Sequence, residues 1–197
     1  MARKKAYEEK IVKLILLKEG TYDLGKNVII KCPISIHGAG QDKTILQRHG
    51  IKIQGTKKEK KRVNMQGMTM KGSSEDGLEA RDGLSFLCKD MTFTQCGHSG
   101  VHAASNTKGR LINCVITQCG ESGIYSGNNA LIELKGDQTK VDGNVTSWNI
   151  GGYGLDTSDT SSIIHLLSPL TQEYVSTNNG GGGNYGGEGT IETVNSF

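Results

Sequence analysis

The sequence predicts an all-β solenoid, in which short strands wind into coils that stack on one another. Residues 94–103 (TQCGHSGVHA) are nearly restated at residues 117–126 (TQCGESGIYS). Apolar and polar residues alternate over short segments, and helical spacing is missing. Glycine accounts for 28 of the 197 residues and proline for only two, so the glycine belongs to turns of a folded chain. A repeat of this length holds two or three short strands and tight turns, which is typical of one solenoid coil.

The first third of the chain repeats less clearly but has strand character. Its short β-branched segments are separated by Gly, Pro or Asn, which interrupt strands. We expect strands at residues 14–16, 28–30, 34–36, 44–46 and 51–53. Residues 1–10 form a basic segment that we expect to be separate or to act as a cap, and residues 11–197 form one domain. Seven or eight coils then fit the length of that domain.

Four later coils share a strand-like segment followed by a small-polar, Gly, aliphatic, polar, small pattern. The expected strands are residues 63–70, 86–93, 111–117 and 141–147. The recurring glycines are Gly77, Gly100, Gly123 and Gly154. The last step, from 123 to 154, is eight residues longer than the others, which indicates an inserted loop. We expect these glycines at corners where a Cβ atom would obstruct the path.

Stacked coils place equivalent residues about 4.8 Å apart, so inward positions form ladders of similar side chains. We expect one interior ladder of Leu78, Val101, Ile124 and Leu155 and another of Met68, Met91, Val115 and Val145. The small thiols of Cys96 and Cys119 suit a narrow interior and stack in the same way. Residues 174–194 contain a glycine run, yet residues 190–194 alternate like a strand. We therefore expect a final coil with a Gly-rich turn.

The opening coils resemble a known family. Residues 16–24 (LLKEGTYDL), 34–40 (ISIHGAG) and 44–46 (TIL) look like the first coils of right-handed parallel β-helix proteins of the pectin-lyase-like superfamily. Pectate lyases, pectin esterases, polygalacturonases and phage tailspikes share this architecture. The chain is most similar to the "right-handed β-helix region" repeats, which also occur in non-enzymatic proteins. The resemblance implies a right-handed parallel β-helix over roughly residues 11–195.

The resemblance transfers no catalytic residue. Polygalacturonases use an Arg-x-Lys segment on one of their coils, which residues 11–197 lack, and Arg81 and Arg110 belong to no recognisable lyase motif. Pectin esterases combine aspartates, glutamines and an arginine in a motif that is also missing. Because one fold hosts many functions, the architecture alone does not assign an activity.

Aligning the coils by their glycines places outward polar residues in two columns. Two positions after each glycine stand the candidate catalytic residues Glu79, His102, Tyr125 and Asp156. Two positions before it stand the candidate binding residues Glu75, His98 and Glu121. Alternation along a strand directs both columns away from the interior. Such residues suit acid–base chemistry or a recognition surface, although solvated positions of a solenoid are polar in any case.

Our functional hypothesis is a non-catalytic β-helix scaffold or recognition domain that binds a protein or a glycan along its outer face. The alternative is a polysaccharide lyase or glycoside hydrolase of the pectin-lyase-like class that uses the same columns. With three Phe, six Tyr and one Trp, long aromatic sugar platforms are not expected, which favours a protein partner or an assembly. Open solenoid ends expose strand edges, so we also expect end-to-end or lateral oligomers.

The amino-acid composition also indicates which classes of partner are not expected. The 23 basic and 20 acidic residues give a net charge of +3, so we expect no nucleic acid or membrane partner. We read the basic run at residues 57–62 as a solvated loop. No cofactor is expected and no metal, although His98 with Glu75 and Glu121 is the best available ligand trio. Five cysteines without a C-x-x-C pair, and no secretory signal, favour a cytoplasmic location.

Overall fold

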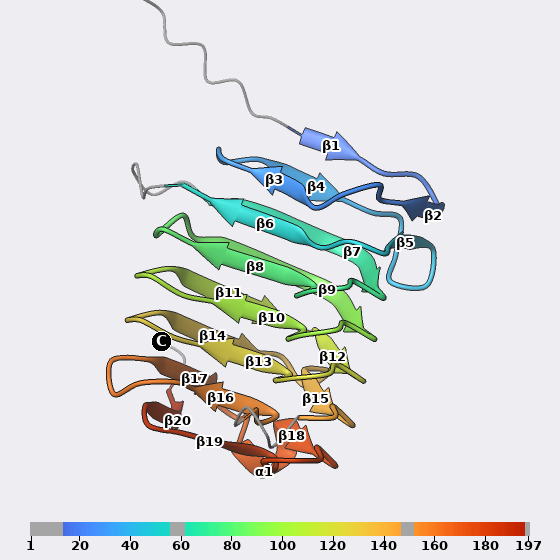
Figure 1. Ribbon diagram of the computed structural model, residues 1–197. Helices are drawn as coiled ribbons and strands as arrows, with labels where there is room; N and C mark the ends of the chain where they lie inside the picture. Colours follow the sequence, from blue (N-terminus) through green and yellow to red (C-terminus); the bar gives the residue numbers. More distant parts are fainter. Residues whose placement is uncertain (1–13, 56–61, 147–151, 196–197) are drawn as a thin grey trace, which may run out of the picture.

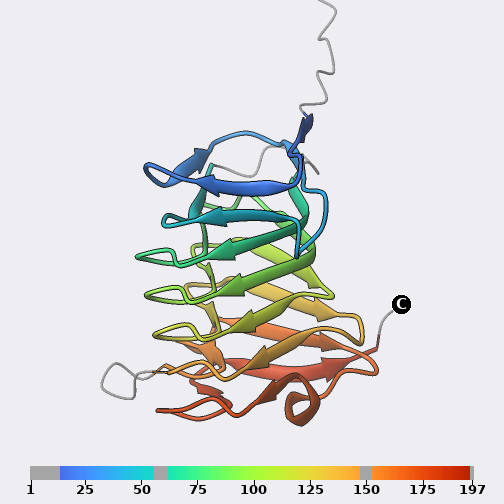
Figure 2. The same cartoon turned by 90° about the vertical axis from the view of Figure 1, so that its right-hand side faces the viewer.

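A computed structural model describes residues 14–55, 62–146 and 152–195 of the chain. These residues form about seven coils stacked along one axis (Figure 1). Seen a quarter turn away, the coils lie one beneath the other from the N-terminal to the C-terminal end (Figure 2). The predicted right-handed parallel β-helix of about seven or eight coils is therefore confirmed.

The first four coils contain ten strands. The first two coils contribute β1 (Leu14–Leu16), β2 (Gly20–Asp23), β3 (Val28–Ile30), β4 (Ser35–His37), β5 (Thr44–Gln47) and β6 (Ile51–Gln54). The third and fourth contribute β7 (Val63–Lys71), β8 (Leu78–Arg81), β9 (Phe86–Thr94) and β10 (Val101–Ala103). The strands expected in the first third of the chain all form; the one expected at residues 34–36 is shifted by one position.

The lower coils repeat the same path with shorter strands. The fifth and sixth contribute β11 (Lys108–Ile112), β12 (Val115–Thr117), β13 (Ile124–Ser126), β14 (Leu131–Lys135), β15 (Lys140–Asp142) and β16 (Leu155–Thr157). The seventh contains β17 (Ile163–Leu167), the short helix α1 (Gln172–Val175), β18 (Ser176–Thr177) and β19 (Tyr185–Gly187), and β20 (Thr190–Val194) follows it. The final coil with its Gly-rich turn, predicted at residues 174–194, is confirmed.

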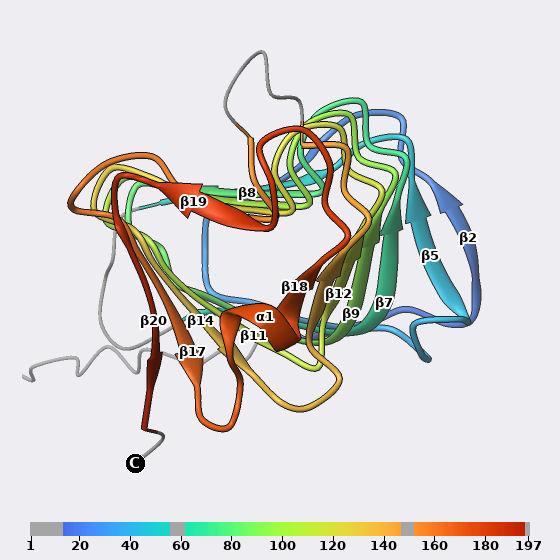
Figure 3. The same ribbon diagram turned by 90° about the horizontal axis from the view of Figure 1, so that it is seen from below.

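Every strand pairing joins equivalent strands of successive coils in parallel. One sheet of seven strands has the order β19-β16-β13-β10-β8-β6-β3. The other sheet has 13 strands, because the long strands β7 and β9 run through a bend and join two sides of the coil. Viewed along the stack, the coils superimpose, and the seven-stranded sheet faces the larger one across the interior (Figure 3).

The bend in the larger sheet explains why one predicted strand is divided. Gly67 and Asp90 occupy this bend in β7 and β9 with positive φ values of 64° and 49°. In the next coil Asn113 has a φ of 51°, and the expected strand at 111–117 is split there into β11 and β12. The strand expected at 141–147 is limited to β15, and residue 147 lies outside the described residues.

A second corner bends at one residue of left-handed conformation per coil. Because Gln95 and Gln118 directly follow paired strands, they occupy the same place in successive coils, and each has a φ of 57°. The equivalent residues in other coils are Arg48, Gly72, Gly143 and Asn178, all with positive φ. A non-glycine residue rarely adopts this conformation, so the stacking of coils determines it here.

The interior ladders follow the register, and one prediction about them is wrong. Leu78, Val101, Ile124 and Leu155 pair in sequence and are fully buried, as expected. Met68 and Met91 also pair, but the next position inward belongs to Cys114, because Val115 pairs with Thr92. Val145 is 61% exposed and does not belong to a ladder. Cys96 and Cys119 are buried in successive coils, joined by a backbone hydrogen bond from Gly120 N–H to Cys96 O of 2.9 Å.

The four recurring glycines lie where the next coil leaves no room for a side chain. A Cβ atom on Gly100 would lie 2.4 Å from Cγ2 of Ile116 and 2.9 Å from the carbonyl oxygen of Gly123. A Cβ atom added to Gly77 or Gly123 would likewise lie 2.7 Å from the carbonyl oxygen of the recurring glycine in the next coil. The predicted corner role of these glycines is confirmed, and its cause is close contact between coils rather than a positive φ.

Two sequence expectations lie outside the described residues. The N-terminal segment or cap at residues 1–10 is one of them. The other is most of the basic run, residues 57–61, although Arg62 is described and its Nε donates to Oδ1 of Asn64 at 2.9 Å.

Replacing Gly100 by alanine tests the contact between coils. We expect Gly100→Ala to lower the free energy of unfolding by about 1–3 kcal/mol, because the added methyl group overpacks the interior against Ile116. Gly25→Ala is the matched control, since nothing lies within 4 Å of its added Cβ atom. Urea unfolding of both variants measures the difference. Equal destabilisation by the two substitutions would contradict the close-contact explanation.

Candidate functional site

The candidate catalytic column lies on the outer face of the seven-stranded sheet. The parallel register pairs Glu79 with His102, His102 with Tyr125, and Tyr125 with Asp156. The structure extends this column upward to Lys52, which pairs with Glu79. Sequence reasoning missed Lys52 because the offset from Lys52 to Glu79 is 27 residues, not the regular 23. Five consecutive coils therefore contribute one polar or aromatic side chain each.

At the upper part of the column, Lys52 holds two carboxylates. Its Nζ atom lies 2.7 Å from Oε2 of Glu75 and 2.9 Å from Oε2 of Glu79. Arg81 forms a further ion pair with Glu79. The hydrogen bond to Lys52 lowers the pKa of Glu75, and the hydrogen bonds to Glu75 and Glu79 raise the pKa of Lys52. The two glutamates, one from each predicted column, thus meet at a shared cation.

In the middle of the column, His102 contacts a carboxylate that sequence reasoning did not select. Oδ2 of Asp76 lies 3.4 Å from Nδ1 of His102, and the two side chains are only 10% and 18% exposed. Oδ1 of Asp76 accepts a hydrogen bond of 2.9 Å from the Ser99 backbone N–H. The His102 and Tyr125 rings are tilted by 45°, with centroids 4.4 Å apart. Asp76 therefore orients an imidazole that also contacts an aromatic ring.

The lower end of the column is less accessible than an outward strand position predicts. Asp156 is only 6% exposed, and its Oδ2 accepts a hydrogen bond of 2.7 Å from Oγ of Ser122. Burial raises the pKa of Asp156 to about 6, while hydrogen bonds from Ser122 and the Tyr153 backbone and the proximity of His102 act in the opposite direction. Asp156 can therefore exchange a proton near neutral pH.

The candidate binding column is held together mainly by its backbone. The His98 N–H donates to Glu75 O and the Glu121 N–H to His98 O, each at 3.2 Å. Nε2 of His98 lies 3.9 Å from Oε1 of Glu121, whereas the Glu75 side chain binds Lys52. The three residues therefore do not converge as one ligand trio. In the described parts of the chain, no group of three or more His, Cys, Asp or Glu side chains is arranged to hold a metal ion.

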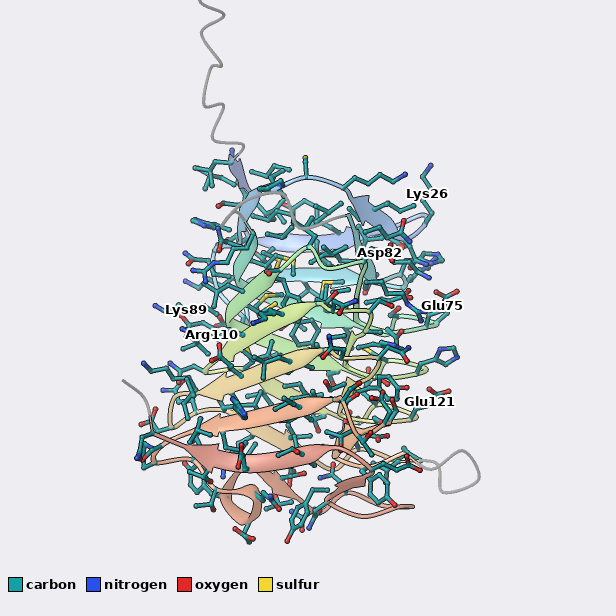
Figure 4. All side chains as sticks on the ribbon, turned by 90° about the vertical axis from the view of Figure 1, so that its left-hand side faces the viewer. Lys26, Glu75, Asp82, Lys89, Arg110 and Glu121 are labelled. Atoms are coloured by element: carbon teal, nitrogen blue, oxygen red, sulfur yellow. The ribbon has the colours of Figure 1, made fainter. Side chains whose placement is uncertain are left out.

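The charged residues on the opposite side of the stack form separate pairs. Glu75 and Glu121 point outward on one side, and Lys89 and Arg110 lie on the other (Figure 4). Arg110 belongs to β11 of the larger sheet, where its NH2 group lies 2.7 Å from Oε2 of Glu133. It is therefore remote from the column, unlike Arg81. His165, also on the larger sheet, lies 3.4 Å from Glu192.

Comparison with known proteins adds one finding about this architecture. A family model described as "Right handed beta helix region" matches residues 15–197. No curated protein and no solved structure matches the chain. Within the described ranges, none of the helices has the length and apolar character needed to cross a bilayer.

Stability measurements against pH test the buried state of Asp156. Unfolded chain ionises this carboxyl near pH 3.9, whereas burial raises its pKa in the folded chain to about 6. The protonated Asp156 carboxyl therefore adds to the free energy of unfolding below about pH 4. This contribution, on the order of 3 kcal/mol, is lost as the pH rises from about 4 through about 6. We expect Asp156→Asn, which still accepts the Ser122 hydrogen bond, to remove this loss. Chemical unfolding of both proteins from about pH 4 to pH 7 checks it. A wild-type minus variant difference that is constant over this range refutes the assignment.

Proposed function

This chain belongs to the right-handed β-helix family, and from that premise we propose that it is a non-catalytic recognition scaffold. Its ligand is an extended protein segment or glycan strand that lies along the outer face of the seven-stranded sheet. The observation that carries the proposal is the column in register from Lys52 to Asp156. Side chains repeated about every 4.8 Å suit a ligand that runs parallel to the stack.

The fixed charges of the column support recognition. Lys52, Glu75 and Glu79 hold one another through ion pairs of 2.7 and 2.9 Å, and Arg81 adds a fourth charge. Side chains that are ordered before binding lose little conformational freedom on binding, which favours affinity. The same ion pair argues against Glu75 as a proton donor, because the hydrogen bond to Lys52 lowers the pKa of its carboxyl group.

The composition of the face favours protein over glycan as the ligand. Tyr125 is the one Phe, Tyr or Trp side chain among the five column residues, and its ring is already packed against His102. Sugar rings commonly stack on exposed aromatic faces, and one partly occupied ring is a short platform for them. An extended peptide instead uses the charged and hydrogen-bonding groups on either side of that ring.

A specific observation also favours a second candidate function, the cleavage of a polysaccharide by a lyase or hydrolase. His102 lies beside Asp76 and near Asp156, whose pKa is raised to about 6. A buried carboxylic acid can donate a proton, and an imidazole oriented by a carboxylate can accept one. In this function His102, oriented by Asp76, accepts a proton, and protonated Asp156 donates one.

Binding measurements test the recognition function. A display library of random peptides and immobilised polygalacturonate and alginate are the probes. We expect wild-type protein to bind at least one of them, and His102→Ala and Tyr125→Ala to weaken that binding about tenfold or more, since each removes a central contact. His165→Ala is the matched control, because His165 is also an outward, half-buried histidine beside a carboxylate but lies on the larger sheet.

The same variants, together with Asp76→Asn, separate the two functions. The recognition proposal predicts neither unsaturated products nor new reducing ends from either polysaccharide. Cleavage that is lost in Asp76→Asn and His102→Ala but retained in His165→Ala would favour the enzyme instead. Binding that is equally strong in all variants would place the ligand away from the column.

A further inference from the structure

One corner of the coils carries two thiols that lie one above the other. Thr94 pairs with Thr117 in parallel register. Cys96 and Cys119 each follow two residues later, and a hydrogen bond of 2.9 Å from Gly120 N–H to Cys96 O continues the stacking past the corner. The two cysteines therefore occupy the same position in the fourth and fifth coils, whose backbones lie about 4.8 Å apart.

The asparagines that follow in the next coils show that side chains of successive coils touch at this corner. Asn144 and Asn179 take the same position in the sixth and seventh coils. Nδ2 of Asn144 donates to Oδ1 of Asn179 at 2.9 Å. Oδ1 of Asn144 accepts a hydrogen bond of 3.0 Å from Cys119 N–H. The ladder at this corner is therefore continuous from Cys96 to Asn179, and its two thiols are neighbours.

The two thiols have the same surroundings in their two coils. A Cβ atom added to Gly77 would lie 2.9 Å from Sγ of Cys96. One added to Gly100 would lie 3.2 Å from Sγ of Cys119. Each thiol donates to the carbonyl oxygen two residues before it, at 3.8 Å for Cys96 and 3.5 Å for Cys119. A spacing of about 4.8 Å between equivalent residues lies within the roughly 4.4–6.8 Å between Cα atoms that a disulfide spans, so rotation about χ1 can join the two sulfur atoms.

The hydrogen bond between the two thiols makes them chemically unequal. It lowers the pKa of the Cys119 thiol and raises the pKa of the Cys96 thiol. A hydrogen bond with the Cys96 backbone also lowers the pKa of Cys119, while burial acts in the opposite direction. The thiolate is the form that attacks an oxidant, so Cys119 reacts first and Cys96 is in position to follow.

Two other buried cysteines of the same coils do not form an equivalent pair. Cys88 pairs in register with Leu111, and Cys114 lies three residues farther along the fifth coil. The Cys114 thiol donates to the backbone oxygen of Cys88 at 3.6 Å. Burial raises the pKa of the Cys88 thiol and raises that of Cys114 to about 12. These two thiols are therefore a control for burial without matching positions.

We propose that Cys96 and Cys119 are a redox pair that hydrogen peroxide, the smallest hydroperoxide, converts into a disulfide joining the fourth and fifth coils. Cys119 loses its proton and its sulfur attacks one peroxide oxygen. The O–O bond breaks, a sulfenic acid forms, and the departing hydroxide takes the proton to give water. The sulfur of Cys96 then attacks the sulfenic sulfur, the S–O bond breaks, and the released hydroxide takes the Cys96 proton to give a second water. The two thiols lose two electrons, and one peroxide is reduced to two waters.

The disulfide has a defined place in the stack. It joins the coil that carries His102 to the coil that carries Tyr125, which are paired in the candidate column. It also closes a loop over residues 96–119, which restricts the unfolded chain and stabilises the folded one. Cys96 and Cys119 are at most 2% exposed, so peroxide reaches them when this corner opens locally. The reaction is therefore slow in the folded protein and reversible by a thiol reductant.

Treatment of the full chain with hydrogen peroxide tests the proposal. We expect the protein to lose two of its five thiols, counted with a thiol reagent after unfolding, and to regain both with dithiothreitol. Digestion should give one cross-linked peptide pair containing Cys96 and Cys119, lighter by two hydrogen atoms than its separate parts. The oxidised protein should melt at a higher temperature than the reduced protein.

Variants identify the pair and the order of reaction. Cys96→Ala and Cys119→Ala should each abolish the cross-link, and Cys96→Ala should leave a sulfenic acid on Cys119 that dimedone traps. The double variant Cys88→Ala and Cys114→Ala is the matched control, because it removes two buried thiols of the same coils and should still form the cross-link.

Other results overturn the proposal. A wild-type protein that keeps all five thiols while the backbone amides of residues 96 and 119 exchange with solvent would refute it, because the corner has then opened without reaction. Irreversible oxidation without a cross-link would also refute it, as would a disulfide that contains Cys88 or Cys114. These measurements use wild-type protein, so they stand even if a variant fails to fold.

Discussion

The parallel register between successive coils is the constraint on which the rest of this structure depends. Each strand satisfies its backbone groups with the equivalent strand of the next coil, so every coil must follow the same path. The chain therefore keeps 23 residues between His102 and Tyr125, which pair directly. The offset from Tyr125 to Asp156 is 31 residues, eight more than the regular 23, and these two residues still pair. The number of residues in a coil can therefore change only at the corners and not within the paired strands.

This constraint explains how much of the fold and site follows from sequence. A constant offset turns into a spatial contact, so the glycine positions sufficed to predict the ladder from Leu78 to Leu155 and the column from Glu79 to Asp156. The prediction failed where residues were assigned to a ladder because they are aliphatic, and not because of their offset along the sequence from the preceding ladder residue. Val115 and Val145 are aliphatic, but the position 23 residues after Met91 is Cys114, and the interior takes Cys114 instead. The repeat did not reveal Lys52, because the offset from Lys52 to Glu79 is longer than the regular 23 residues.

Other parts of the site depend on bends and burial that strand alternation does not describe. Near Gly77 the chain turns a corner, and there Asp76, not Glu75, comes within 3.4 Å of His102. A signal for this contact existed in the position just before each glycine, which carries Asp76, Ser99 and Ser122, all three hydrogen-bonded around the column. The raised pKa of Asp156 results from its burial, and no local sequence pattern specifies burial at an outward strand position.

The register that aligns the column also leaves a stack without a natural end, because every coil presents the same edge to the next. At the last coil helix α1 lies against the stack, and its Gln172 donates from Nε2 to the carbonyl oxygen of Ile191 in β20. At the first coil the interior ladders begin with aliphatic residues, since Ile15 pairs with Ile36 and Val28 pairs with Ile51. The candidate column also becomes apolar at the first coil, where Ile29 pairs with Lys52. The polar column proposed for recognition therefore begins at Lys52, in the second coil, and does not reach the first coil.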